Sequence, residues 1–539
     1  MPTFAELVEA RAHDGHAGLR FEDETYTWAR VVHEARRRAA FALAMRDPGR
    51  PFHVGVLLDN VPEYVFWIFG AALAGAVVVG VNPTRRGAEL AADIRHTDCL
   101  FLVTDSGRAS LLNGMDLGVP VLLADSPGYR SSLDSHEGAS RTVAESDPLL
   151  LLFTSGSTGA PKAVICSQGR LAMIAAHGMA FGIGRGAVTY AAMPLFHGNA
   201  VMANLAMATY GGATVALRRR FSASGFLPDI RKYGVTYFNY VGRALAYILA
   251  TPERPDDADN SLAAAFGTEA SARDMTEFGR RFGCRTIEGY GSSEGVISIS
   301  KTPGTPPDAL GLASGDTDLA VHDPKTGHEC PRAVFDETRR LVNAHEAIGE
   351  IVRRGATFEG YYNNPEADAR RLRDGWYWSG DLGYRDQDGY FYFAGRDADW
   401  LRVDGENFAA APVERILARY APVIMCAVYA VPDARTGDQV MATLELSGPF
   451  DPGRFAAFLV DQPDLGTKWA PRFVRITGAM PLTPTNKVDK TGLRRERWEC
   501  ADPVFWRPDR EPRYMPMTGA DRAELRKRFS ESGREHFLL

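Results

Sequence analysis

Short apolar runs alternate with amphipathic segments through most of the first 400 residues. Five runs rich in β-branched and other apolar side chains predict strands, at residues 53–58, 100–104, 119–123, 149–154 and 214–217. Between the strands, residues 62–74 and 88–96 carry apolar positions at helical spacing. Strands that alternate with helices favour an α/β fold, in which helices cover both faces of parallel sheets.

One uncharged stretch approaches the length of a membrane-spanning helix, because no charged residue occurs from Tyr64 to Val81. Gly70, Gly75 and Gly80 interrupt it, and it ends in a run of valines. A buried helix that turns into a buried parallel strand explains both features. We therefore expect no transmembrane segment, and the start of the chain lacks the pattern of a secretory signal.

The pattern changes near residue 396. A strand over residues 390–394 leads to Gly395-Arg396, and a polar segment follows. New elements are then predicted, in the order helix, strand, helix, strand, at residues 412–420, 423–431, 452–459 and 473–476. We expect four divisions of the chain, namely an N-terminal domain, a hinge, a C-terminal domain and a tail that packs on the body, at residues 1–396, 397–399, 400–500 and 501–539. Thr518 and Asp521 form a capping pair for a helix in the tail.

Composition narrows the class of protein. The 539 residues are 45% hydrophobic and 24% charged, which excludes global disorder. The net charge of −6 comes from 61 basic and 67 acidic residues that are interspersed, so we expect no nucleic-acid partner. Six cysteines lie far apart without a CxxC pair, which favours a reducing cytoplasm.

The strongest local signal follows the apolar strand at residues 149–154. It is a loop of hydroxyl and glycine residues that ends in a lysine, with the candidate phosphate-binding residues Thr154, Ser155, Gly156, Ser157, Thr158, Gly159 and Lys162. Glycines let backbone N–H groups approach a phosphate, hydroxyls add donors, and the lysine adds charge. The spacing differs from the Walker pattern. Ser167 offers an N-cap for the next helix.

This loop resembles the phosphate-binding signature of the adenylate-forming (acyl-CoA synthetase, AMP-binding) superfamily. Further segments agree in order from Ala5 to Arg497, and the texture is most similar to the actinobacterial long-chain fatty-acyl-CoA ligase branch, which also contains ATP-dependent diazotases. The resemblance implies a large N-terminal domain of two βαβ-type sheets plus a small β-barrel-like part. It also implies a smaller, mobile α+β C-terminal domain, and a catalytic as well as a binding role for Thr158.

Residues 288–295 resemble the family's YGxTE segment. There an aromatic such as Tyr290 can stack on adenine, and the hydroxyl of Ser293, beside Gly291, can meet the α-phosphate. Glu294 can hold Mg²⁺, which binds one or two carboxylates together with substrate phosphates. Upstream, two residues match the stretch that borders the adenine and acyl sites, Gly267 and Glu269.

Two segments further along complete the resemblance. Asp381 matches the aspartate that binds both ribose hydroxyls, and Arg396 matches an arginine that also reaches the ribose. Lys487 matches the catalytic lysine that swings into the site and stabilises charge during adenylate formation. Lys490 lies close by and is interpreted as a surface cation.

His197 lies in a segment that resembles the gate motif of the acceptor pocket. A lone histidine is commonly a structural group, but in this motif we expect it to gate or contact the substrate. Nearby residues mix apolar with polar character, which indicates a pocket that is not purely lipid-like; they are Met202, Leu205 and Met207 with Asn204, Tyr237 and Asn239.

Two positions depart from the family pattern. The hinge usually carries a polar residue two places after the arginine, and Ala398 stands there, with Asp399 one place later. Asp404 occupies a loop that in relatives contains a lysine near the CoA pantetheine, which puts the thiol-transfer step in question.

We therefore predict an ATP- and Mg²⁺-dependent ligase that activates a carboxylic acid as acyl-AMP and transfers it to CoA. A diazotase that adenylates nitrite and diazotises an aromatic amine is the alternative, favoured by the polar pocket candidates and Asp404. A third class is a non-enzymatic binding protein on the same scaffold, and the intact site residues argue against it. The expected partners are small-molecule substrates, and a homodimer is compatible with the sequence.

Overall fold

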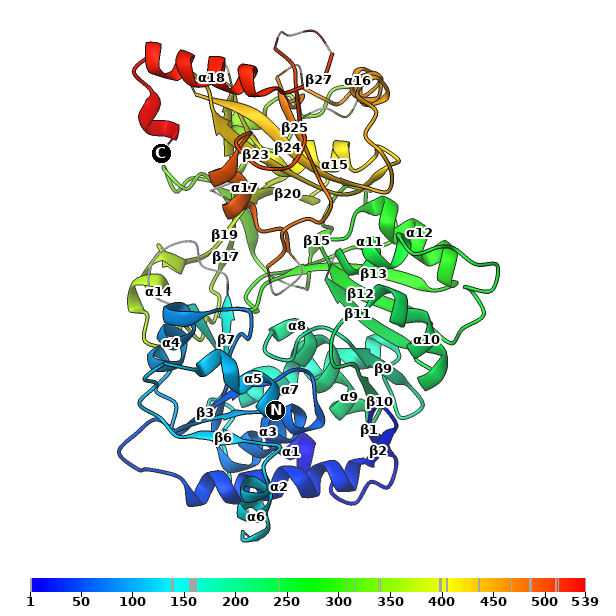
Figure 1. Cartoon of the computed structure of the whole chain (residues 1–539). Coiled ribbons are helices and arrows are strands. Elements are labelled where there is room, and N and C mark those ends of the chain that lie inside the picture. Colours follow the sequence, from blue (N-terminus) through cyan, green and yellow to red (C-terminus); the bar gives the residue numbers. More distant parts are fainter. Residues whose placement is uncertain are drawn as a thin grey trace.

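The computed structural model describes residues 2–136, 140–154, 162–241, 243–306, 308–315, 317–337, 339, 341–396, 400–403, 406–434, 437–466, 468–483, 487–508, 511 and 513–538. Mixed and parallel sheets, covered by helices, dominate the architecture (Figure 1). The predicted α/β fold is confirmed.

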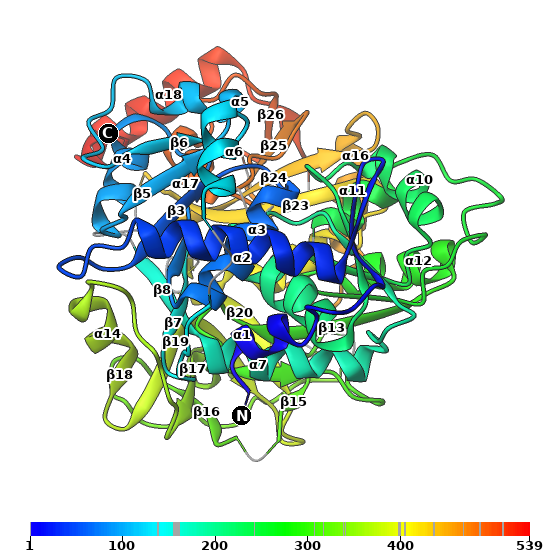
Figure 2. The ribbon, with the colours of Figure 1, turned by 90° about the horizontal axis from the view of Figure 1, so that it is seen from below.

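The first sheet contains six strands in the order β6-β5-β3-β4-β7-β8. In chain order they are β3 (His53–Leu57), β4 (Val77–Gly80), β5 (Phe101–Thr104), β6 (Val121–Leu123), β7 (Pro148–Thr154) and β8 (Lys162–Ser167). All neighbours are parallel except β7 and β8. Helix α2 (Trp28–Ala44) precedes these strands, and the helices between them include α3 (Pro62–Ala74) and α4 (Gly87–His96). Figure 2 shows α2 running across α3 on the outer face.

The uncharged stretch forms two buried elements, as expected. It covers α3, whose residues from Tyr64 to Ala74 are all buried, and the buried parallel strand β4. Gly75 ends α3 in the left-handed conformation with φ 68°, which a glycine adopts without strain. Among the described residues, no helix is long and apolar enough to cross a membrane.

The second sheet contains nine strands in the order β15-β14-β13-β12-β11-β9-β10-β1-β2. Its strands are β1 (Ala17–Phe21), β2 (Glu24–Thr27), β9 (Val188–Ala191), β10 (Thr214–Leu217), β11 (Tyr237–Val241), β12 (Ala264–Thr268), β13 (Arg285–Gly291), β14 (Ser298–Ser300) and β15 (Leu312–Ala313). The central pairs are parallel, and β2, β14 and β15 are antiparallel to their neighbours. The carboxyl ends of β12 and β13 therefore meet at one edge, where ligands commonly bind in such sheets.

A smaller antiparallel sheet forms the β-barrel-like part. It consists of β16 (Leu319–His322), β17 (Gly349–Arg354), β18 (Leu372–Arg373), β19 (Trp376–Arg385) and β20 (Phe391–Arg396). Apolar side chains of this sheet pack against β14 in one buried cluster that includes Ile299, Ile351 and Phe391. This packing fixes β19 and β20 next to the end of β13.

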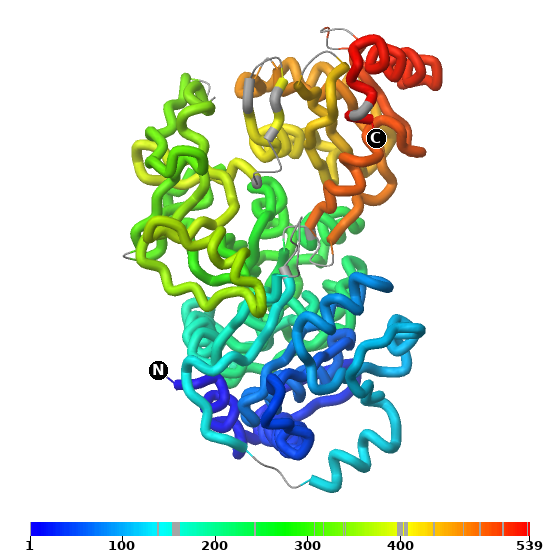
Figure 3. Tube along the Cα trace, turned by 90° about the vertical axis from the view of Figure 1, so that its left-hand side faces the viewer, coloured from blue at the N-terminus to red at the C-terminus, as the bar shows by residue number. Residues whose placement is uncertain are grey.

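The C-terminal part is built on a five-stranded sheet of β23 (Val423–Pro432), β24 (Asp438–Leu446), β25 (Phe473–Thr477), β26 (Val504–Trp506) and β27 (Met515–Pro516). A hairpin of β21 (Trp400–Val403) and β22 (Glu406–Ala409) precedes it, and its helices are α15 (Ala410–Leu417), α16 (Pro452–Val460), α17 (Lys490–Glu496) and α18 (Gly519–Glu531). In Figures 1 and 3 this part lies at the opposite end of the molecule from α2.

The tail continues that sheet. Strand β26 pairs with β25 and β27 pairs with β26, and α18 packs Leu525 and Phe529 into the same core. The predicted capping pair is present, because Thr518 and Asp521 bond each other's backbone N–H groups at the start of α18. The division of the chain into domains at residues 396–399 and 500 stays a prediction.

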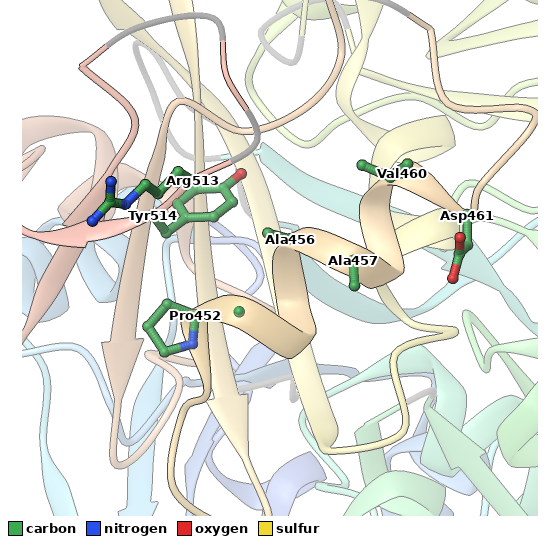
Figure 4. Close-up of a pocket in the computed structure, with 8 residues that line it drawn as sticks. Pro452, Ala456, Ala457, Val460, Asp461, Arg513 and Tyr514 are labelled. Atoms are coloured by element: carbon green, nitrogen blue, oxygen red, sulfur yellow. The ribbon is translucent and has the colours of Figure 1, made fainter.

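A shallow pocket of about 560 Å³ lies on the C-terminal part, between α16 and residues 513–514 (Figure 4). Its lining includes Ala456, Val460 and Tyr514 and none of the predicted site residues. The predicted site residues lie elsewhere, where the strand ends converge.

Candidate active site

The phosphate-loop segment connects two antiparallel strands. Thr154 ends β7 and Lys162 begins β8, and the two residues are register partners. Helix α7 (Gln168–Ala176) begins only after β8, where Ser167 caps it as predicted by accepting a hydrogen bond from the Arg170 N–H. The loop itself lies outside the described residues, with Ser155, Gly156, Ser157, Thr158 and Gly159, so its role in phosphate binding stays a prediction.

Glu294 lies at the centre of a buried cluster that follows β13. The Tyr361 hydroxyl donates to Glu294 Oε1 at 2.6 Å, and Arg371 Nε donates to the same hydroxyl oxygen at 3.1 Å. Glu294 is only 7% exposed. Burial raises the pKa of Glu294, but the hydrogen bond from Tyr361 and the charge of Arg371 bring it below its ordinary value. The carboxyl group is therefore ionised at neutral pH, which suits a magnesium ligand.

Tyr361 also connects this cluster to the phosphate-loop strand. Val164 of β8 and Tyr361 form an antiparallel bridge, and the Tyr362 N–H donates to the Ala163 carbonyl at 2.9 Å. The Lys162 ammonium lies 6.0 Å from the centre of the Tyr361 ring, within the range of a cation–π contact. A positive group and a buried carboxylate thus contact the same tyrosine.

Arg170 of α7 connects the turn before Glu294 to β8. Its guanidinium donates to the carbonyls of Ser293 and Ile165 and contacts Glu359. Glu359 in turn accepts hydrogen bonds from the backbone N–H and the hydroxyl of Ser167. This network fixes the Ser293 backbone relative to the strand that leaves the phosphate loop.

Four neighbours of the site were not predicted from the sequence, namely Tyr361, Arg371, Arg170 and Glu359. These residues lie far from the predicted motifs along the chain. The pairing of β8 with residues 360–362 and the position of α7 bring them to the site. A buried Glu294 needs hydrogen-bond partners, and this need was the one available signal. The sequence does not say which residues supply them.

A second contact of the site joins Tyr290 and Asp381. The Tyr290 hydroxyl donates to Asp381 Oδ2 at 2.6 Å, and Asp381 is 8% exposed. In the β19–β20 pair, Asp381 is the register partner of Arg396. Three residues predicted for the nucleoside are therefore adjacent, with Gly291 at the end of β13 beside them. The proposed ring stacking of Tyr290 on adenine and the ribose contacts stay predictions.

Gly267 and Glu269 lie at the end of β12. A Cβ at Gly267 would overlap the Tyr240 carbonyl oxygen, so only glycine allows this approach of β12 to β11. Glu269 adopts the left-handed conformation with φ 68°. Its carboxylate oxygen Oε1 lies 2.5 Å from Lys487 Nζ, which brings the predicted catalytic lysine of the C-terminal part to the edge of the nine-stranded sheet.

His197 lies directly before the short helix α8 (Gly198–Ala200). Burial, together with the charge of Lys487, lowers the pKa of His197 to about 3, so the imidazole is neutral. Its buried Nε2 atom has no hydrogen-bond partner among the described residues. A π-helical turn, η3 (Val201–Leu205), follows, and such turns frequently occur at functional sites.

The polar residues near His197 are buried and hydrogen-bonded. Asn204 and Asn239 are both 0% exposed, and Asn204 Nδ2 donates to Asn239 Oδ1 at 2.7 Å. Thr189 donates to Asn204, and the Tyr237 hydroxyl donates to the Ala203 carbonyl. These polar side chains are hydrogen-bonded inside the fold, as buried polar groups require, and the partly polar pocket stays a prediction. Met202, Leu205 and Met207 are buried in the main core.

Two further predictions lie outside the described residues. They concern the hinge segment 397–399 and residue Asp404. The departures from the family pattern at Ala398 and Asp404 therefore remain observations on the sequence alone.

Comparison with known proteins shows the family of the chain. Residues 8–362 match the sequence model of the family described as AMP-binding enzyme. The chain is 53% identical to a steroid-22-oyl-CoA synthetase of Rhodococcus jostii, over 99% of both chains. It is 46% identical to a medium/long-chain-fatty-acid–CoA ligase of Mycobacterium marinum, over 94% of this chain and 98% of the relative.

Solved structures give the same fold. An anthranilate CoA ligase in complex with anthranoyl-AMP superposes with a TM-score of 0.79, at 22% identity, over 92% of this chain and 96% of that chain. The predicted AMP-forming ligase of the acyl-CoA synthetase type is confirmed, whereas these relatives give the diazotase alternative no support. The sheets, the convergence of strand ends and the sequence match together place this chain in the AMP-binding enzyme family.

Proposed function

We propose that this enzyme activates a large, mainly apolar carboxylic acid with ATP and transfers the acyl group to CoA. The carboxylate oxygen attacks the α-phosphorus of ATP and releases pyrophosphate. The thiol of CoA then attacks the acyl carbon, loses its proton and releases AMP. The names of the similar proteins support this substrate class, since they describe a steroid acid and medium- to long-chain fatty acids.

The observation that carries the proposal is the convergence of three ion-pair or hydrogen-bond contacts at one set of strand ends. Lys487 meets Glu269, Tyr290 meets Asp381, and Tyr361 meets Glu294. Attack of an anion on a triphosphate is opposed by charge repulsion, and positive groups placed at the phosphates offset it. Lys162 at the start of β8 and Lys487 just before α17 would supply such groups.

Glu294 would hold the magnesium ion. Its carboxylate is buried, ionised at neutral pH and kept in place by Tyr361 and Arg371, which fits a hard cation that binds few protein ligands. The ion would neutralise charge on the triphosphate. A cytoplasmic location accords with the use of ATP and CoA and with six free cysteines.

The proposal is tested with purified enzyme, ATP, Mg²⁺ and CoA against a panel of acids. We expect thioester formation with a steroid acid bearing a side-chain carboxyl group, or with medium- and long-chain fatty acids, and little with anthranilate. The panel includes nitrite with an aminoaryl acid. Turnover with nitrite alone among these compounds contradicts an acyl substrate.

A further inference from the structure

The contact between Glu269 and Lys487 connects two parts of the chain that are far apart in sequence. Glu269 follows β12 of the nine-stranded sheet, and Lys487 precedes α17 of the C-terminal part. Their side chains are 46% and 37% exposed, and Nζ lies 2.5 Å from Oε1. The ion pair is therefore reached by solvent and does not lie in the core.

The backbone holds Glu269 firmly at this place. Gly267 packs against the Tyr240 carbonyl, and the Ala270 N–H donates to Glu288 Oε1 at 2.7 Å. Between these two anchors Glu269 has φ 68°, a conformation that costs free energy for a residue with a Cβ. Strain of this kind, held by tight surroundings, is typical of functional positions.

Backbone contacts also hold Lys487 in place. The Thr483 N–H donates to the Lys487 carbonyl at 2.6 Å, the Lys487 N–H donates to the Thr483 hydroxyl at 3.1 Å, and Leu482 bridges Val488. The Lys487 ammonium contacts Glu269, and its charge also reaches the buried ring of His197. The lysine thus contacts a carboxylate, and its charge acts on the predicted acyl gate.

A substrate carboxylate that approaches Lys487 must compete with Glu269, because two carboxylates beside one ammonium repel each other. We propose that Glu269 is a positioning residue that occupies the place of the acid's carboxylate, holds Lys487 in the site before substrate binds, and yields it when the acid arrives. This inference rests on the proposed function.

The first test measures Lys487 directly and needs no substrate. Acetylation by N-hydroxysulfosuccinimidyl acetate, followed by peptide mass spectrometry, reports how readily each lysine leaves its ion pair. In Glu269→Gln we expect Lys487 to react several times faster, whereas Lys490, paired with Glu414 at 3.0 Å, keeps its rate as the internal standard. An unchanged ratio of Lys487 to Lys490 labelling overturns the proposal.

Two further variants separate charge from folding. Glu269→Asn also removes the charge but adopts the left-handed backbone readily, so a faster reaction of Lys487 in both variants, at an unchanged melting temperature, excludes local unfolding. Glu499→Gln makes the same chemical change in the remote pair with Arg526 and should leave Lys487 labelling as in the wild type.

The second test concerns the acid. In Glu269→Gln the acid no longer has to displace a carboxylate from Lys487. The KM for the acid should therefore fall by up to about fivefold, which corresponds to the free energy of a partly exposed ion pair. A KM that stays the same or rises contradicts the exchange. If the wild-type enzyme makes no thioester from any acid, the proposed function fails, but the labelling ratio still decides whether Glu269 holds Lys487.

Discussion

At the scale of single residues, the site depends on how buried charges are satisfied. Glu294 is kept ionised by one hydroxyl donor and one guanidinium, whereas His197 is kept neutral by burial and by a nearby ammonium. At neutral pH Glu294 is therefore an anion, and the His197 ring is uncharged. The surroundings that set these charge states can be changed by substitution.

Replacing Tyr361 by phenylalanine removes the hydrogen bond to Glu294. A bond to a charged group contributes about 1.5–3 kcal/mol, so kcat/KM for ATP at limiting Mg²⁺ should fall by about tenfold or more. Because that bond lowers the pKa of Glu294, its loss raises the pKa and moves the acid limb of the pH profile to higher pH. The neighbouring change Tyr362→Phe, which removes a hydroxyl bonded to Asp98, serves as the control and should leave the limb in place.

His197 should not titrate across the physiological range. Its pKa is lowered to about 3 by burial and by Lys487, so the ring gains a proton only in strong acid. In a ¹⁵N spectrum of labelled histidines, the signal lost in His197→Gln should keep its position between about pH 5 and pH 8. A midpoint near the ordinary histidine value would show that the ring is exposed to water and charges with the solvent.

At the scale of elements, the position of each strand along the chain can be predicted far better than which elements it lies next to. The apolar runs at 53–58, 100–104 and 214–217 became β3, β5 and β10 within one residue, because length and alternation report burial directly. The helix predicted at 412–420 begins earlier, at Ala410, since helix ends carry weaker signals than interiors.

The candidate site was predictable only as far as local motifs reach. Lys162, Asp381 and Lys487 each stand in a recognisable segment, and the fold brings partners to each of them. Tyr361 and Arg371 stand in no such segment, because their role arises from a strand pairing made across nearly two hundred residues of chain. The spacing of residues within a local motif does not predict a contact between segments that are so far apart along the chain.

Gly267→Ala tests whether the end of β12 requires a close approach. The new Cβ would overlap both the ring and the carbonyl oxygen of Tyr240, so β12 must shift away from β11. We expect a loss of about 1–3 kcal/mol in stability, seen as a lower melting temperature, together with weaker ATP binding by calorimetry. Gly186→Ala is the matched control, since no atom lies within 4 Å of its Cβ position, and its melting temperature should stay unchanged. Equal melting temperatures for the two variants would show that β12 is not tightly packed at this point.

At the scale of the whole molecule, the C-terminal part contributes Lys487 to a site otherwise made by the N-terminal sheets and the β-barrel-like part (Figure 1). A lysine that acts only while phosphorus is attacked should matter for adenylate formation and little for thiol transfer. Lys487→Met should therefore lower ATP–pyrophosphate exchange by about a hundredfold or more, the size found when one charge-stabilising donor is removed. Thioester formation from pre-formed acyl-AMP and CoA should persist.

Lys490→Met, three residues further along the chain, controls for local damage and should support ATP–pyrophosphate exchange like the wild type. If Lys487→Met lost both half-reactions equally, or neither, the lysine would not be the group that stabilises the phosphoryl centre, and the two parts of the chain would meet at this ion pair for structural reasons alone.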